Sequence, residues 1–176
     1  TDWGTNIGIC AYAIQQLAYA GPSGSLFAPG DKYLEDQQTS NVLFQIFYGD
    51  VAQNCAEILS QTGPGGFDEG NKVNMRNATR ILRVLCFHRL TDWYGNIPYF
   101  NANKGINGIF SPAYDKQKDI YADLLKELDE ATASLNSSYQ DEGFAAADFI
   151  YKGDTDKWKR FGYSLMLRLA MRISDV

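Results

Sequence analysis

The chain has 176 residues, of which 45% are hydrophobic and 21% are charged. This composition is ordinary for a globular protein, and we predict a single domain over residues 1–176. The formal net charge is −5, whereas a surface that binds phosphates requires clustered Lys and Arg. The charge therefore argues against nucleic acid as a partner.

Cysteine and histidine usage argues against a metal centre. Cys10, Cys55 and Cys86 stand alone in apolar stretches without C-x-x-C spacing, and His88 is the single histidine. We interpret the cysteines as small buried hydrophobic residues; the alternative is one disulfide with a leftover thiol. We expect neither a metal ion nor another cofactor.

The two ends of the sequence are abrupt. It starts at Thr1 without a basic and apolar leader, and Val176 follows a helical pattern without a stop signal. We therefore expect it to be cut from a longer chain. No run of eighteen apolar residues occurs, so no segment is predicted to span a bilayer.

Apolar residues recur with helical spacing along most of the chain, and almost nothing alternates with the period of two that strands require. We therefore predict an all-α fold. The predicted helices are Thr5–Ala20, Ser40–Leu59, Asn74–Trp93, Asp115–Leu135 and a fifth that begins near Asp154 and runs through Ile173. Helices two and three, and then four and five, form two helix–loop–helix pairs. This arrangement predicts tetratricopeptide-like packing with long loops.

No sequence motif points to catalysis. There is no G-x-S-x-G, P-loop or G-x-G-x-x-G, and His88 lies four residues before Asp92, which favours a structural pair on one helix face. Paired carboxylates for glycoside hydrolysis stay open, because their separation is spatial. Arg160, Arg168 and Arg172 follow one stripe of the last helix. We interpret them as ion pairs with a neighbouring element; the alternative is a contact with an anion or a partner protein.

Aromatic side chains in the loops are the candidates for ligand binding. The apolar C–H face of a sugar ring stacks on an aromatic ring, while polar side chains bind its hydroxyls. The carbohydrate-binding candidates are Phe27, Tyr33, Phe67 and Tyr99. The alternative for each of them is that the ring pins a long loop onto the helices.

Three blocks of sequence are more specific than the helical periodicity alone. They are Arg80–Asp92 followed by Trp93-Tyr-Gly-Asn-Ile-Pro-Tyr99, then Ser111–Gln117 with Ile120-Tyr121 and Leu128–Ala131, and last Ile150–Asp154 with Lys157-Trp158 and Leu165–Ser174. In order and spacing these blocks resemble the SusD/RagB-like outer-membrane nutrient-binding lipoproteins, in their starch-binding-associated subgroup. Two positions depart from the pattern: Asn96 replaces the usual Asp, and Gly162-Tyr163 stands where a small residue and Asn are common.

The resemblance implies a surface-exposed lipoprotein of the outer membrane, held by an N-terminal lipid anchor, of which this chain is the N-terminal portion. Such a protein covers a TonB-dependent SusC-like transporter and delivers oligosaccharides to it without catalysis. The matching residues imply scaffold roles for Trp93, Tyr94, Gly95, Pro98, Tyr114, Asp115, Gln117, Tyr121, Gly153, Asp154, Trp158, Arg168 and Arg172. Two other classes stay open: a tetratricopeptide-like adaptor for a partner protein or peptide, and a surface glycoside hydrolase.

Overall fold

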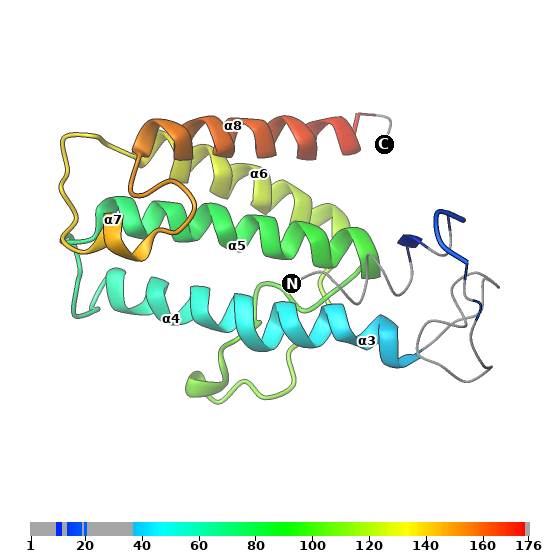
Figure 1. The fold of residues 1–176 in the computed structure, drawn as a ribbon. Helices are drawn as coiled ribbons and strands as arrows, with labels where there is room; N and C mark the ends of the chain where they lie inside the picture. Colours follow the sequence, from blue (N-terminus) through cyan, green and yellow to red (C-terminus); the bar gives the residue numbers. More distant parts are fainter. Residues whose placement is uncertain (1–9, 12–13, 19, 21–36, 175–176) are drawn as a thin grey trace. The chain divides into compact units, whose positions relative to one another are not determined.

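A computed structural model describes residues 10–11, 14–18, 20 and 37–174 (Figure 1). The chain forms two compact units, residues 1–50 and residues 51–176. In the first unit, half of the predicted helix Thr5–Ala20 lies outside the described residues. Its predicted end is wrong, because Ile14–Leu17 form turns and bends and Gln15 has a φ of 60°, which a right-handed helix does not allow.

The remaining predicted helices are present, with boundaries shifted by a few residues. They are α3 Gln37–Gln45, a π-helical segment Ile46–Ala52, α4 Gln53–Thr62, α5 Val73–Tyr94, α6 Gln117–Ser134 and α8 Thr155–Arg172. The short elements, a 3-10 turn Gly105–Asn107 and α7 Phe144–Ala147, were not predicted. Over the described residues there is no strand, only an isolated bridge between Ile97 and Asp115. The all-α prediction is confirmed.

In the second unit, α5 is the central helix (Figure 1). It contacts α4, α6 and α8, and α6 also packs against α8. The predicted pairs are therefore confirmed as α4 with α5 and α6 with α8. Among the described helices, none is long and apolar enough to cross a membrane.

In the core, α6 and α8 each bury one apolar stripe, whereas the central helix α5 buries residues on more than one face. The buried side chains include Ile81, Val84, Phe87 and Leu90 of α5, Ile120, Leu124, Leu128 and Ala131 of α6, and Trp158, Leu165 and Leu169 of α8. Complete burial of one such large side chain stabilises a fold by roughly 1.5–3 kcal/mol. Cys55 and Cys86 are buried with them as free thiols, as predicted. Burial raises the pKa of the Cys55 thiol to about 11, so the group is protonated and unreactive.

Side chains outside the helices accept hydrogen bonds from the backbone at the starts of α8 and α6. Oδ1 of Asp154 accepts hydrogen bonds from the backbone N–H groups of Asp156 and Lys157 and so caps α8, whose start is predicted near this residue. Asn96 does the same for α6, since its Oδ1 accepts from the backbone N–H of Gln117 at 3.0 Å. The Asn at position 96 therefore retains the acceptor oxygen that an Asp would supply.

Candidate functional site

The three sequence blocks meet at the carboxylate of Asp92. Tyr121 of α6 donates its hydroxyl to Oδ1 of Asp92, and Nε of Arg172 on α8 lies 2.9 Å from Oδ2. Close by, the side-chain amide of Gln117 donates to the backbone carbonyl of Thr91 at 2.6 Å. These residues join helices α5, α6 and α8. A pocket of about 660 Å³ opens here, and it is lined by Asp92, Gln117, Lys118, Tyr121, Ala122, Arg172 and Ile173.

His88 is fully buried beside this carboxylate. Its Nε2 lies 3.2 Å from Oδ2 of Asp92, so the predicted proximity of the two side chains is confirmed. Neither ring nitrogen, however, makes a hydrogen bond within the described part of the chain. Burial lowers the pKa of His88; Asp92 opposes this shift and Arg168 and Arg172 add to it. The imidazole is therefore neutral at pH 7.

The arginine stripe of α8 divides into different environments. Arg172 is the member that forms the predicted ion pair, with Asp92. Arg168 is exposed on α8 and acts on the pKa of His88 through its charge. Arg160 is exposed near the start of the helix, and its backbone carbonyl accepts the hydroxyl of Ser164.

Tyr99 is buried, with 1% of its surface exposed, and this contradicts its prediction as a sugar platform. Its ring meets Phe87 edge-on at 4.9 Å between centroids, and its hydroxyl donates to Oδ2 of Asp123 at 2.7 Å. The guanidinium carbon of Arg83 lies 4.9 Å from the ring centroid. The ring and its polar group are thus committed to the fold, so Tyr99 pins its loop to α5 and α6.

Of the other three carbohydrate-binding candidates, Phe67 is the one that the structure describes. Phe67 is 90% exposed, in the loop between α4 and α5. That loop is closed by the backbone N–H of Gly65, which donates to Oε2 of Glu69 at 2.8 Å. Phe27 and Tyr33 lie outside the described residues. Phe67 is therefore the candidate whose ring is seen to be open to a ligand.

The carboxylate of Asp115 shapes the loop that follows α5 and carries further scaffold residues. Oδ2 of Asp115 accepts from the backbone N–H groups of Tyr99 and Phe100, at 2.8 and 2.9 Å. Before them, α5 ends with Trp93 and Tyr94, Gly95 follows with a φ of 72°, and Pro98 directly precedes Tyr99. Tyr114, in contrast, is 67% exposed and does not belong to the core.

Asp148 was missed by the sequence reasoning. Its carboxylate accepts from the backbone N–H groups of Ile150, Tyr151 and Gly153, and from Nε1 of Trp158 at 2.7 Å. Burial raises its pKa, but these four donors lower it by more, so the pKa of Asp148 lies below its ordinary value. One buried carboxylate thus fixes the turn that leads into α8.

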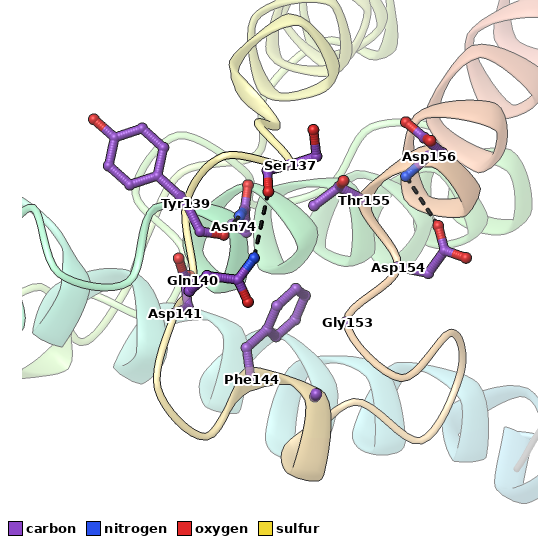
Figure 2. Close-up of a pocket in the computed structure, with 11 residues that line it drawn as sticks. Asn74, Ser137, Tyr139, Gln140, Asp141, Phe144, Gly153, Asp154, Thr155 and Asp156 are labelled. Carbon is purple, nitrogen blue, oxygen red and sulfur yellow. Dashed lines mark hydrogen bonds between the residues drawn. The ribbon is translucent and has the colours of Figure 1, made fainter.

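A polar pocket of about 270 Å³ opens beside this turn, at the end of the unit where α5 and α8 begin (Figure 2). Its lining comes from the α5 start, the loop after α6, α7 and the α8 start. The lining residues are Asn74, Ser137, Tyr139, Gln140, Asp141, Phe144, Ala145, Gly153, Asp154, Thr155 and Asp156. Although three of them are aspartates, the described residues contain no group of His, Cys, Asp or Glu suited to hold a metal ion.

The loop that forms one wall of the pocket is held by Asn74. Its Nδ2 donates to the backbone carbonyls of Asn136 and Tyr139, at 2.8 and 3.1 Å, and its Oδ1 accepts from the backbone N–H of Asn136 at 2.9 Å. Oδ2 of Asp141 accepts from the backbone N–H of Met75 at 2.7 Å, and so caps α5. Oδ1 of Asp141 is buried and has no hydrogen-bond partner among the described residues.

Comparison with known proteins gives the family. The profile described as "Starch-binding associating with outer membrane" matches residues 11–176. A search of curated proteins finds no match. The chain belongs to the SusD-like family, and its helix pairs are the SusD-like fold.

Solved structures agree with this assignment. A chitin-binding protein is 34% identical, with a TM-score of 0.81 over 98% of this chain and 35% of its own. A SusD homologue from Parabacteroides distasonis is 30% identical, with a TM-score of 0.79 over 99% of this chain and 32% of its own. A chitin-binding SusD homologue from Flavobacterium johnsoniae is 33% identical, with a TM-score of 0.61 over 76% of this chain and 27% of its own. The chain thus spans about a third of the length of these relatives.

Proposed function

We propose that this chain is part of a cell-surface glycan-binding protein that captures oligosaccharides without cleaving them. The observation that carries the proposal is the match to the SusD-like family over residues 11–176, together with two chitin-binding relatives at 34% and 33% identity. In this proposal a lipid anchor holds the full-length protein at the outer membrane. The glycan then passes to a TonB-dependent SusC-like transporter.

The chemistry of the chain suits a neutral glycan. With a net charge of −5 the protein repels polyanionic ligands at long range, and its loops supply aromatic rings with amide and carboxylate groups. Because two of the relatives are named as chitin-binding, oligosaccharides of N-acetylglucosamine are the first ligands to test.

Within this proposal, Phe67 is a stacking platform, and Phe27 and Tyr33, which lie outside the described residues, are further candidates. Burying one exposed aromatic ring against a sugar contributes on the order of 1 kcal/mol, which is roughly a fivefold change in affinity. Phe67→Ala in the full-length protein is expected to weaken glycan binding by about that factor. Phe110→Ala is the matched control, because its ring is similarly exposed (84%) in a different loop.

A glycan array with the full-length protein tests the binding function, and a reducing-sugar assay on the same preparation tests the absence of catalysis. We expect binding to neutral glycans without release of reducing ends. Release that disappears when a carboxylate is replaced would instead support a glycoside hydrolase.

One observation favours a second candidate, a partner-protein contact. Tyr163, Leu167 and Met171 of α8 are 54%, 65% and 67% exposed and lie four residues apart, so they form an apolar stripe along the helix. Such a stripe suits an adaptor that packs against another helix. Binding of peptides or proteins but of no glycan would favour this candidate.

A further inference from the structure

The pocket beside Asp92, which we call the Asp92 pocket, is lined by the ends of three helices. It opens where α5 and α8 end and α6 begins (Figure 1), and its volume is about 660 Å³. Pockets that bind small molecules usually have volumes of roughly 300–1,000 Å³. The Asp92 pocket is therefore large enough for a small organic molecule.

The walls of the Asp92 pocket are fixed by contacts inside the protein. Tyr121 of α6 donates its hydroxyl to one oxygen of Asp92, and Nε of Arg172 on α8 lies 2.9 Å from the other. The side-chain amide of Gln117 donates to the backbone carbonyl of Thr91 at 2.6 Å. Because these contacts hold the three helix ends together without a ligand, the hollow is preformed, which reduces the entropy cost of binding.

The lining has an excess of positive charge. It contains two cationic side chains, Lys118 and Arg172, and one carboxylate, Asp92. Arg172 compensates the charge of Asp92. Lys118 is exposed and has no hydrogen bond or ion pair among the residues that the structure describes. The Asp92 pocket therefore keeps one uncompensated positive charge, although the protein as a whole carries −5.

Both cationic groups can be reached from solvent. The side chain of Arg172 is 51% exposed, and its contact with Asp92 uses Nε. Within the described part of the chain, neither terminal nitrogen of this guanidinium has a partner. A guanidinium has five N–H donors in a planar fork that matches a carboxylate, and charge-assisted hydrogen bonds are stronger than neutral ones. Arg172 thus retains donors for a ligand, beside the free ammonium of Lys118.

The rest of the lining is largely apolar. Ala122 and Ile173 contribute aliphatic groups, and Tyr121 contributes an aromatic ring whose hydroxyl is already bonded to Asp92. Contact with apolar surface favours a ligand by about 25 cal/mol for each Å² removed from water. An inorganic anion would leave this part of the pocket empty. A phosphate monoester carries about −1.5 to −2, whereas a carboxylate carries the single negative charge that matches the excess.

We infer that the Asp92 pocket binds a small organic carboxylate. The negative group of this ligand lies between Lys118 and Arg172. Its apolar part packs against Tyr121, Ala122 and Ile173. The inference does not depend on glycan binding, because a neutral oligosaccharide lacks the negative group.

Binding to the full-length protein tests the class of ligand. The probes are 3-phenylpropionate, 4-methylpentanoate and indole-3-acetate, titrated at pH 7 and low ionic strength and followed by ligand-observed NMR. We expect saturable binding of at least one carboxylate and at least about tenfold weaker binding of its neutral amide. Equal affinity of acid and amide would overturn the inference, and so would the absence of binding for all three acids.

A blocking variant with a matched control tests the location. Ala122 and Ala133 are both exposed and lie about three turns apart on one face of α6, but only Ala122 lines the Asp92 pocket. Ala122→Phe is expected to weaken binding of the tightest carboxylate probe by at least about tenfold. Ala133→Phe is expected to leave the affinity unchanged, and thermal melting verifies that both variants fold.

Lys118→Gln gives a second readout that does not depend on adding bulk. Because it removes the uncompensated charge, we expect the affinity for the same probe to fall about three- to tenfold. Lys126→Gln, at a position of α6 that is 74% exposed and outside the pocket, is expected to have no effect. Unchanged affinity in both Ala122→Phe and Lys118→Gln, with wild type binding normally, would place the carboxylate elsewhere and overturn the inference.

Discussion

Oδ2 of Asp92 lies 2.9 Å from Nε of Arg172, and this contact joins the end of α5 to the end of α8. The other oxygen of the same carboxylate accepts the hydroxyl of Tyr121 from α6. One side chain, 16% exposed, therefore links the three helices whose sequences carry the family signature. The signature describes how the helices are held together, and the polar pocket beside α7 lies at their opposite ends.

Replacement of Asp92 is expected to destabilise this junction. Asp92→Ala removes the acceptor for Tyr121 and the partner of Arg172, and we expect a loss of about 1–3 kcal/mol in the free energy of unfolding. Urea denaturation followed by circular dichroism measures the change. Asp129→Ala, at an exposed position of α6, is the control and is expected to change stability by less than about 0.5 kcal/mol. Equal effects of the two substitutions would contradict the role of Asp92.

The close approach of α8 to α6 depends on Gly162. A Cβ at this position would lie 2.3 Å from Oγ1 of Thr132 and 3.3 Å from Cδ1 of Ile81. Gly162→Ala is therefore expected to lower the unfolding free energy by about 1–3 kcal/mol. Since Oγ1 of Thr132 is buried without a hydrogen bond in the described part of the chain, Thr132→Ala in the same protein should restore part of the loss. A double variant less stable than Gly162→Ala would show that the clash lies elsewhere.

The turn before α8 is expected to depend on Asp148. In Asp148→Asn an N–H₂ group takes the place of one oxygen. It then faces either the N–H groups of Gly153 and Trp158 or those of Ile150 and Tyr151, so we expect a loss of about 2–4 kcal/mol. Because the folded pKa of Asp148 is lowered, its contribution is present above the ordinary value of 3.8 and is lost as pH falls through the folded pKa. Denaturation of wild type and variant at pH 7 measures the first effect. A loss below about 1 kcal/mol would contradict it.

His88 is expected to make the free energy of unfolding depend on pH between about pH 5 and pH 7. Its folded pKa is lowered from 6.5, so below pH 6.5 the unfolded chain takes up a proton before the folded protein does. Stability should therefore fall on acidification from pH 7 toward pH 5, by up to about 1.4 kcal/mol per pH unit. Urea titrations at several pH values measure the slope. His88→Gln should remove it, and an unchanged slope in that variant would assign it to another group.

Much of the fold could be predicted from local patterns in the sequence. The apolar spacing within α5, α6 and α8 predicts these helices, and the start of α8 lies next to Asp154 as predicted. Tyr99 shows the limit, because its loop sequence does not reveal that the ring packs between Phe87 and Arg83 of an earlier helix. Such burial is decided by the path of the loop in space, to which periodicity does not apply.

The polar pocket beside α7 could not be predicted from the sequence for a related reason. Asn74 and Asn136 are 62 positions apart, and they meet through a side-chain to backbone hydrogen bond. Polar residues in loops are the ordinary composition of any exposed turn, so Gln140 and Asp141 gave no signal. The role of Asp148 could not be predicted either. A carboxylate that accepts hydrogen bonds from backbone N–H groups of its own turn does not require a particular residue type at a fixed spacing.

Calorimetric titration of the full-length protein with neutral oligosaccharides, and with short peptides in parallel, tests the central claim most directly. The account predicts saturable binding of at least one neutral oligosaccharide, with an affinity that Phe67→Ala reduces and Phe110→Ala leaves unchanged. Saturable binding of peptides together with no binding of any glycan would contradict it.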